Sequence, residues 1–253
     1  SARFTPDRTI ARSSLMDLKE LELAGGDAAS HWYYRAKSEM MLSHLHGLKL
    51  DSVMDIGSGS GFFARQILQN TSSREVTCVD PGYDADLDKE VGTKTLRFVR
   101  SVETADCDLM VMMDVLEHIE DDVGFLGDYA GMARPGTHLF VTVPAFQFLW
   151  SGHDVFLEHF RRYTLASLTR LVRGAGFDIV RSHYFFGAAF PLAAMLRLKD
   201  RLLPGGEPES SMRSHSPLVN NMAYRICRAE MALMTLNRFA GLSAVMLARK
   251  PGA

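Results

Sequence analysis

The sequence predicts an α/β fold with a doubly wound, mostly parallel, seven-stranded sheet and a helical insertion before the last strand. Short apolar segments alternate with segments of helical periodicity along most of the chain, as in α/β proteins with parallel sheets. Residues 109–113 read Leu-Met-Val-Met-Met, a continuous apolar run typical of a central strand covered on both faces. A glycine-rich turn at residues 57–61 follows the first predicted strand, where open α/β sheets bind ligands.

The predicted elements follow one another in a regular order. A helix over residues 30–48 carries Ala36, Met40 and Met41 on one face and precedes the first strand. Later helices begin near Asp121 and at Thr164, because both side chains can cap a helix N-terminus. Further helices are expected at residues 14–23 and 62–69, and strands at residues 52–56, 75–79, 95–99, 109–113, 138–143, 177–186 and 242–248.

The chain is expected to form a single domain over residues 1–253. Residues 1–50 form an N-terminal helical segment that we expect to cover the site. Residues 187–241 form a helical insertion, or cap, with an expected helix on each side of a loop that contains proline and glycine. This insertion is too short to build its own hydrophobic core, so it should pack on the same sheet.

The composition is ordinary for a globular protein and narrows the class of partner. The 253 residues are 47% hydrophobic and 23% charged, and the formal net charge of −2 gives no strong field toward nucleic acid. Cys78, Cys107 and Cys227 form no Cys-x-x-Cys pair, which favours a reducing environment. No segment is long and apolar enough to span a bilayer. We therefore expect a cytoplasmic protein with no nucleic-acid partner and no transmembrane segment.

The turn at residues 55–61 reads Asp-Ile-Gly-Ser-Gly-Ser-Gly, in which the glycines let the backbone come close to a ligand. A dinucleotide-binding fingerprint would need a third glycine at position 62, which is Phe62. A P-loop would need Lys followed by Ser or Thr after Gly61, but Phe62 and Phe63 follow it. The turn therefore predicts a nucleotide-type site that differs from both.

Three segments carry a resemblance to a known family. Residues 53–61 resemble motif I of the class I S-adenosylmethionine (SAM)-dependent methyltransferases, and Asp80 resembles the acid that follows the second strand in that family. Residues 114–119, Asp-Val-Leu-Glu-His-Ile, resemble the segment after the fourth strand in small-molecule methyltransferases. The resemblance covers residues 30–186 and the last strand, and it implies the Rossmann-like methyltransferase fold.

The resemblance implies SAM as the cofactor and S-adenosylhomocysteine (SAH) as the product. Asp55 would reach the methionine amino group, and Asp80 would accept hydrogen bonds from the two ribose hydroxyls. Ser101 stands where many relatives contact adenine through Asp. A structural turn for Asp55 and a cap on the Pro81 turn for Asp80 are the alternatives. The expected cofactor contacts are Asp55, Gly57, Ser58, Gly59, Gly61, Asp80, Pro81, Ser101, Val102, Asp114 and Val115.

His118, His153 and His159 are the candidate catalytic residues, in that order of preference. All three follow the fourth or fifth predicted strand, and an imidazole near its ordinary pKa can remove a proton from a hydroxyl or an amine. A purely structural role is the alternative for each. We expect no metal, because His153, Asp154 and His159 have suitable ligand types but lack the tight spacing of a metal site.

Two segments are candidates for binding the acceptor. The aromatic group at the start of the helix before the first strand could form a lid, and the basic segment after the fifth strand should face the mouth of the site. Their residues are Trp32, Tyr33, Tyr34, Arg161, Arg162 and Tyr163. An ordinary hydrophobic helix face and a salt-bridged helix start are the structural alternatives.

The sequence therefore predicts transfer of the methyl group of SAM to an oxygen or nitrogen of a small-molecule acceptor, by an enzyme that could form a homodimer. One alternative is a non-catalytic SAM-binding or scaffold subunit within a complex. Another is an enzyme that uses this fold for other chemistry, such as decarboxylation or cyclisation. Methylation of nucleic acid is disfavoured, because no Asn/Asp-Pro-Pro-Tyr/Phe signature follows the fourth strand.

Overall fold

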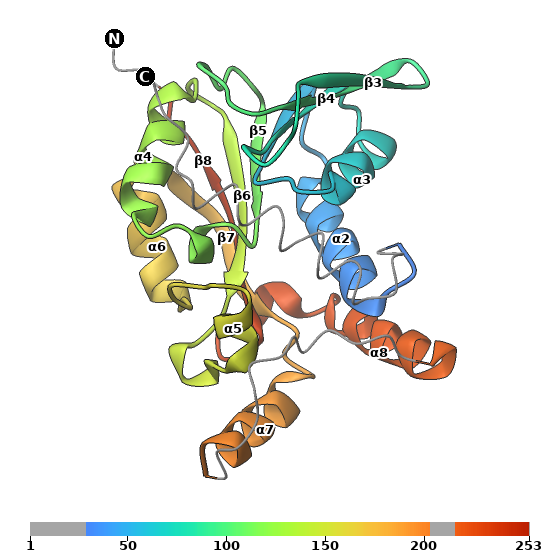
Figure 1. The fold of residues 1–253 in the computed structure, drawn as a ribbon, viewed down its shortest axis with the longest axis vertical. Helices are drawn as coiled ribbons and strands as arrows, with labels where there is room; N and C mark the ends of the chain where they lie inside the picture. Colours follow the sequence, from blue (N-terminus) through green and yellow to red (C-terminus); the bar gives the residue numbers. More distant parts are fainter. Residues whose placement is uncertain (1–28, 203–215, 253) are drawn as a thin grey trace.

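A computed structural model describes residues 29–202 and 216–252 of the chain. Its centre is an eight-stranded sheet in the order β3-β4-β2-β1-β5-β6-β8-β7 (Figure 1). Five neighbouring strands, β4 to β6 in that order, run parallel, whereas β3 and β8 are antiparallel to the strands beside them. The predicted fold class is confirmed. The helix expected at residues 14–23 lies outside the described residues.

The sheet contains one strand that the sequence does not predict. The strands are β1 (Ser52–Ile56), β2 (Glu75–Val79), β3 (Leu87–Val91), β4 (Lys94–Val99), β5 (Leu109–Met113), β6 (His138–Pro144), β7 (Asp178–Phe185) and β8 (Ser243–Arg249). The additional strand is β3, whose residues are mostly exposed and show no apolar alternation. Gly92, with a φ of 68°, turns β3 back onto β4 at the sheet edge. The other strands lie within one residue of their expected ends.

The helices begin where the capping side chains predict. The described helices are α2 (Trp32–Leu45), α3 (Phe62–Asn70), α4 (Asp122–Met132), α5 (Gly152–Phe156), α6 (Leu165–Gly174), α7 (Phe190–Leu202) and α8 (Pro217–Glu230), with 3-10 turns η1 (Leu116–His118), η2 (Gln147–Leu149) and η3 (Met234–Leu236). The Asp121 carboxylate accepts from the Gly124 N–H at 2.9 Å, and the Thr164 hydroxyl accepts from the Ser167 N–H at 3.1 Å. The sequence does not predict α5, because one short turn shows no periodicity.

The central strand β5 is buried on both faces, as its apolar run predicts. Met110 and Met112 pack into an apolar layer with Leu126 of α4, while Val111 packs into the opposite layer with Ile67 of α3. Figure 1 shows α4 and α6 over one face of the sheet and α2 and α3 over the other. The alternation of side chains along one strand thus joins both halves of the hydrophobic core.

The functional end of the sheet is the edge where β1, β5 and β6 finish. Because these strands are parallel, the loops that follow them meet at one edge. The helices α5, α7 and α8 lie toward this end in Figure 1. The start of α2 is tied to α8, since the Trp32 N–H donates to the Asn220 side-chain oxygen at 2.8 Å. No helix among the described residues combines the length and apolar character needed to cross a membrane.

Met112→Ala should destabilise the protein by about 2–5 kcal/mol, because it removes a fully buried side chain from the layer beneath α4. Met222→Ala is the matched control, since Met222 on α8 is 57% exposed and should change stability by less than about 0.5 kcal/mol. Chemical denaturation of the two variants measures both values. Equal stabilities for the two variants would contradict the burial of β5 on both faces.

Candidate functional site

The loop between β1 and α3 needs glycine at two positions. Gly57 has a φ of 68° and Gly61 a φ of 71°, a backbone region that residues with side chains rarely adopt. A Cβ atom on Gly57 would also lie 2.7 Å from Cγ2 of Val115. The loop can therefore pack against the segment after β5 only because this position carries no side chain.

Asp80 lies beside this loop, at the end of β2. Its carboxylate is fully buried and accepts hydrogen bonds from the N–H of Gly59 at 3.0 Å and of Gly82 at 2.9 Å. Tyr83, which the sequence does not predict as a site residue, donates its hydroxyl proton to the Gly59 carbonyl at 2.8 Å. The Tyr83 hydroxyl also lies 2.7 Å from that of Ser58. Asp80 and Tyr83 therefore hold the loop in a defined conformation.

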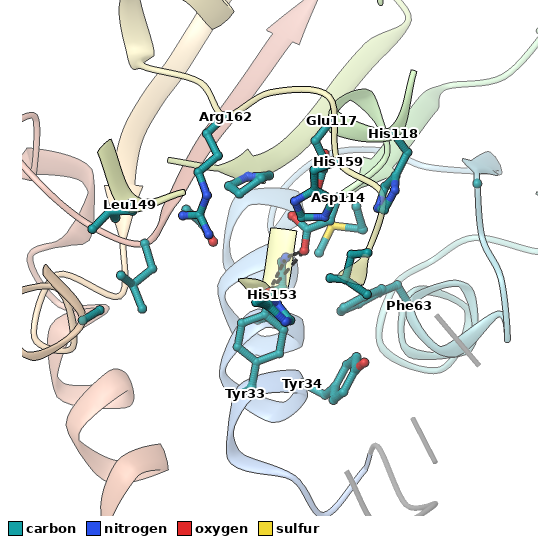
Figure 2. A pocket seen from close by; sticks show the side chains of 18 of the residues that line it. Tyr33, Tyr34, Phe63, Asp114, Glu117, His118, Leu149, His153, His159 and Arg162 are labelled. Carbon is teal, nitrogen blue, oxygen red and sulfur yellow. Dashed lines mark hydrogen bonds and ion pairs between the residues drawn. The ribbon is translucent and has the colours of Figure 1, made fainter. Parts of the chain in front are cut away.

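A cavity of about 260 Å³ joins the glycine loop to the ends of β5 and β6 (Figure 2). The predicted site residues that line it are Trp32, Tyr33, Tyr34, Asp55, Gly57, Ser58, Asp114, His118, His153, His159 and Arg162. The predicted residues outside its wall are Gly59, Gly61, Asp80, Pro81, Ser101, Val102, Val115, Arg161 and Tyr163. The cavity thus contacts one end of the loop and continues into the region where the acceptor is expected.

The aromatic residues at the start of α2 form one side of the cavity. Tyr33 stacks on Phe186 with 5.1 Å between ring centroids, and Trp32 meets the same ring edge-on at 5.8 Å. Tyr34 packs edge-on against Phe62 of α3 at 5.7 Å. These contacts hold the three predicted lid residues against the body of the protein, so that they form a fixed wall.

A buried ion pair that the sequence does not predict closes the cavity beside these aromatic rings. Lys37 of α2 has a side chain that is only 1% exposed, and its ammonium group donates to the Asp114 carboxylate. It also donates to the Tyr33 hydroxyl at 3.0 Å. Lys37 lies four residues before Met41, on the apolar face of the helix. A charged residue on that face is the signal in the sequence that could reveal the pair.

Asp114 faces the cavity from an unusual backbone conformation. Its φ is 56°, which a residue other than glycine adopts only at a cost in energy. Its carboxylate also accepts from the Thr142 hydroxyl at 3.0 Å and the Tyr33 hydroxyl at 3.2 Å. Burial raises the pKa of Asp114, but the Lys37 charge and these hydrogen bonds outweigh it and hold the pKa below its usual value. The cavity therefore contains an ionised carboxylate.

The three candidate histidines also line the cavity, and Figure 2 shows His118 and His159 beside Glu117 and Asp114. The ring centroids of His118 and His159 are 4.6 Å apart, and those of His153 and His159 are 6.4 Å apart. Burial lowers the pKa of His118 to about 3 and that of His153 to about 4. Both imidazoles are therefore neutral at physiological pH. Neutral rings can accept a proton or bind a metal ion.

Asp154 holds His159 in place from behind. Its carboxylate is fully buried and accepts from His159 Nδ1 at 2.9 Å and from Arg162 Nε at 2.6 Å. A second hydrogen bond, from Arg162 Nη2 at 3.0 Å, makes the arginine contact bidentate. Burial raises the pKa of Asp154, but the hydrogen bonds from His159 and Arg162 bring it well below the usual value. Arg162 thus lines the cavity while its guanidinium is engaged with Asp154.

Arg161 and Tyr163 brace the loops behind the cavity. Arg161 forms an ion pair with Asp122 at 2.7 Å. Tyr163 is buried, and its hydroxyl donates to the Leu116 carbonyl at 3.0 Å and lies 2.7 Å from the Asp122 carboxylate. These contacts are of the kind expected from the structural alternative for the basic segment, and acceptor binding by Arg161 and Tyr163 stays a prediction.

Glu117 is a further site residue that the sequence leaves without a role. Its side chain is 1% exposed, and its Oε2 atom has no hydrogen-bond partner. Burial, together with the negative charge of Asp114, raises the pKa of Glu117 well above its usual value. Glu117, His118 and His159 each offer a ligand atom within 4.8 Å of the others. The wall of the cavity therefore contains a carboxyl group and two imidazoles in close proximity.

Comparison with known proteins identifies the family. The sequence matches the model of a methyltransferase domain over residues 26–182, and no curated protein matches the chain. A chain from the complex that contains the Haloferax volcanii Trm112 methyltransferase activator is 15% identical, with 98% of this chain and 100% of that chain covered and a TM-score of 0.57. The cyclase SpnF is 16% identical, with 87% of this chain and 82% of that chain covered and a TM-score of 0.53. Haemonchus contortus phosphoethanolamine N-methyltransferase 2, in complex with SAM, is 14% identical, with 85% of this chain and 52% of that chain covered and a TM-score of 0.53.

The solved structures show a shared fold at low sequence identity, and they include an enzyme that is not named as a methyltransferase. The family match covers more than half of the sequence and includes the glycine loop, Asp80 and the residues of η1. The chain therefore belongs to the methyltransferase-domain family, within the class I SAM-dependent methyltransferase superfamily.

Proposed function

We propose that this protein transfers the methyl group of SAM to an oxygen or nitrogen atom of a small-molecule acceptor and releases SAH. The observation that carries the proposal is the continuous cavity from the glycine loop, at Asp55 and Gly57, to the histidine wall at the ends of β5 and β6. Cofactor and acceptor could meet in this cavity without any rearrangement of the sheet.

The cofactor would lie along the glycine loop. Asp80, at the end of β2, is the proposed acceptor of hydrogen bonds from the ribose hydroxyls, and Asp55 the proposed contact of the methionine amino group. The Haemonchus contortus enzyme of similar fold was crystallised with SAM, which supports the same cofactor here. Ser101 and Val102 follow β4 near the same edge of the sheet and stay proposed contacts of the adenine.

Methyl transfer requires that the acceptor be aligned with the methyl group, that water be excluded from the site and that one proton be removed from the acceptor. The sulfonium already makes the methyl carbon electrophilic, so the protein has to position the acceptor in line with the sulfur–carbon bond. His118 and His153 are the proposed bases: burial lowers the pKa of each, so both rings are neutral and have a free lone pair, but the same shift makes each a weaker base than an ordinary imidazole. In His159 the Nδ1 proton is donated to Asp154, which directs Nε2 to act as the acceptor atom.

The N-terminal segment and the insertion would cover the cavity. Trp32, Tyr33 and Lys37 line it from α2, and Ala193 and Arg197 line it from α7. We therefore propose that α2 and α7, the described parts of the expected N-terminal segment (1–50) and insertion (187–241) that reach the cavity, enclose the acceptor and exclude water, while the sheet positions the cofactor. Residues 1–28 and 203–215 of these two segments lie outside the described residues.

The reaction can be tested without knowing the acceptor. We expect the purified protein, incubated with trideuteromethyl-SAM and a metabolite extract, to produce SAH together with a methylated small molecule that is three mass units heavier than the product formed with unlabelled SAM. Mass spectrometry of both products is the measurement. Binding of SAM without any SAH above the level of a protein-free control would instead support a non-catalytic subunit. Conversion of a metabolite with SAM left intact would support other chemistry on this fold.

Asp80→Ala should weaken the binding of SAH by about 1.5–3 kcal/mol, roughly 10- to 150-fold, because hydrogen bonds to a charged acceptor are lost. Asp84→Ala is the control, because Asp84 is a carboxylate in the same loop after β2 but its side chain is exposed. Isothermal titration calorimetry gives both affinities, and a thermal melt without ligand shows whether the loop still folds. An unchanged SAH affinity in a folded Asp80→Ala variant would eliminate the ribose assignment.

Lys37→Met should destabilise the protein by about 3 kcal/mol, because it leaves the Asp114 carboxylate partly buried without its counterion. The double variant Lys37→Met/Asp114→Asn removes both charges and should recover part of that loss. Lys49→Met, at an exposed position, is the matched control. If urea denaturation shows no difference between Lys37→Met and Lys49→Met, the ion pair does not contribute to folding.

A further inference from the structure

We propose that Glu117, His118 and His159 bind a divalent transition-metal ion, with Zn²⁺ as the first candidate, on the acceptor side of the cavity. Each residue offers one ligand atom, and these atoms all lie within 4.8 Å of one another. Figure 2 shows the three side chains close together on one wall. All three line the cavity, so the remaining coordination positions of an ion would face the space where the acceptor is expected. The binding of an ion does not depend on the proposed methyl transfer.

The carboxyl group of Glu117 is the first argument for an ion. It is 1% exposed, and its Oε2 atom has no hydrogen-bond partner. A buried polar atom without a partner costs about 1–3 kcal/mol relative to a satisfied one, and more when it is charged. A cation between Glu117 and the two imidazoles would satisfy this oxygen. Asp114, Lys37 and Arg162 supply the other nearby charges, and the two cations among them already pair with Asp114 and Asp154.

The partner of His159 is the second argument. His159 donates from Nδ1 to the buried carboxylate of Asp154 at 2.9 Å, so Nε2 is left as the acceptor atom of the ring. The His118 ring lies beside it, with 4.6 Å between the two ring centroids. A carboxylate or a backbone carbonyl behind the ring is the usual arrangement for a histidine that binds a metal, because it fixes the tautomer and the ring direction.

Backbone hydrogen bonds hold η1, which carries Glu117 and His118, next to the segment that carries His159, without any need for an ion. The Phe160 N–H donates to the Glu117 carbonyl at 2.7 Å, which joins the residue after His159 to η1. Asp154 and Arg162 fix the same segment from the other side through the bidentate contact. The ligand atoms are therefore positioned by hydrogen bonds that do not require the ion, as in a preformed site.

The ligand set points to the class of ion. Two imidazoles and one carboxylate, with positions open to a cavity, form the ligand set of catalytic zinc sites and also of non-haem iron(II) sites. Magnesium and calcium prefer oxygen ligands, so they fit this set poorly. An acceptor hydroxyl bound to the ion would be more acidic than in water. With His118 and His159 engaged in this way, His153 becomes the proposed base, a consequence that does rest on the proposed methyl transfer.

The full chain, freed of metal by dialysis against EDTA, provides the direct test. After incubation with Zn²⁺ and desalting, we expect it to retain about one equivalent of Zn²⁺, with a Kd below about 1 μM in competition with a chromophoric chelator. We also expect bound Co²⁺ to show a stronger visible absorption band than aqueous Co²⁺, because tetrahedral coordination intensifies its d–d transitions. Wild-type protein that retains no Zn²⁺ would overturn the proposal.

The variants locate the ion. Glu117→Gln, which preserves the shape of the side chain, and His159→Ala should each weaken Zn²⁺ binding at least about 100-fold, whereas Asp154→Asn should weaken it about 10- to 100-fold by releasing His159. His46→Ala is the matched control, because His46 is exposed and lies outside the cavity. Wild-type affinity in Glu117→Gln and His159→Ala, or a loss confined to His46→Ala, would overturn the proposed ligands.

Calorimetry with SAH separates this inference from the proposed function. We expect the metal-binding variants to keep their affinity for SAH, which shows that they are folded and that the cofactor end of the cavity is intact. If wild-type protein binds SAH and transfers methyl groups but retains no Zn²⁺, the metal site is wrong and the proposed function stands. If it retains Zn²⁺ through these residues but produces no SAH, the metal site stands and the proposed methyl transfer is wrong.

Discussion

The turn at Asp114 is the constraint on which the shape of the cavity depends. The residue ends β5 with a positive φ, and this conformation turns the chain into η1, which carries Glu117 and His118. A strained backbone persists only where neighbouring contacts stabilise it. Here the Asp114 carboxylate is held by Lys37 and Tyr33 of α2 and by Thr142 of β6. One side chain therefore connects a helix and two strands, and the same contacts compensate the strain of its backbone.

The cavity contains several buried charges, and their pairing explains how the protein tolerates them. Lys37 is paired with Asp114, and Arg162 with Asp154, so each pair compensates its own charge inside the protein. The two pairs differ in span: Lys37 and Asp114 lie 77 residues apart in the sequence, whereas Arg162 and Asp154 lie 8 residues apart. Each pair thereby holds one wall in place: α2 against β5, and the loop after α5 against the end of β6, where Arg162 also donates to the Ala145 carbonyl at 3.2 Å.

The sequence predicts most of the fold but only part of the cavity. The central strand β5 is buried on both faces and appears as a continuous apolar run, whereas β2 and β4 are recognisable by alternating apolar residues. The strand β3 has neither pattern, because its side chains are mostly exposed. The glycine loop is recognisable because its backbone requires particular residues at fixed spacing. By contrast, Glu117 looks like an ordinary surface charge until its burial is known, and the place of Lys37 on the apolar face of α2 signals burial without showing that Asp114 is its partner. The proximity of His159 to His118 is hidden as well, since α4, β6 and α5 separate them along the chain.

The position of β8 has a consequence for the order in which the protein folds on the ribosome. β8 lies between β6 and β7, although it follows both in the sequence. The edge strand β7 therefore has no native neighbour until β8 has been synthesised, and α7 and α8 emerge before either strand can be placed. The half of the sheet from β4 to β6 can assemble early, because its strands pair with neighbours that are already available. Closure of the cavity by the segment between β7 and β8 is then a late event, and nascent chains that stop before β8 would leave the hydrogen-bonding edge of β6 unpaired and open to another strand.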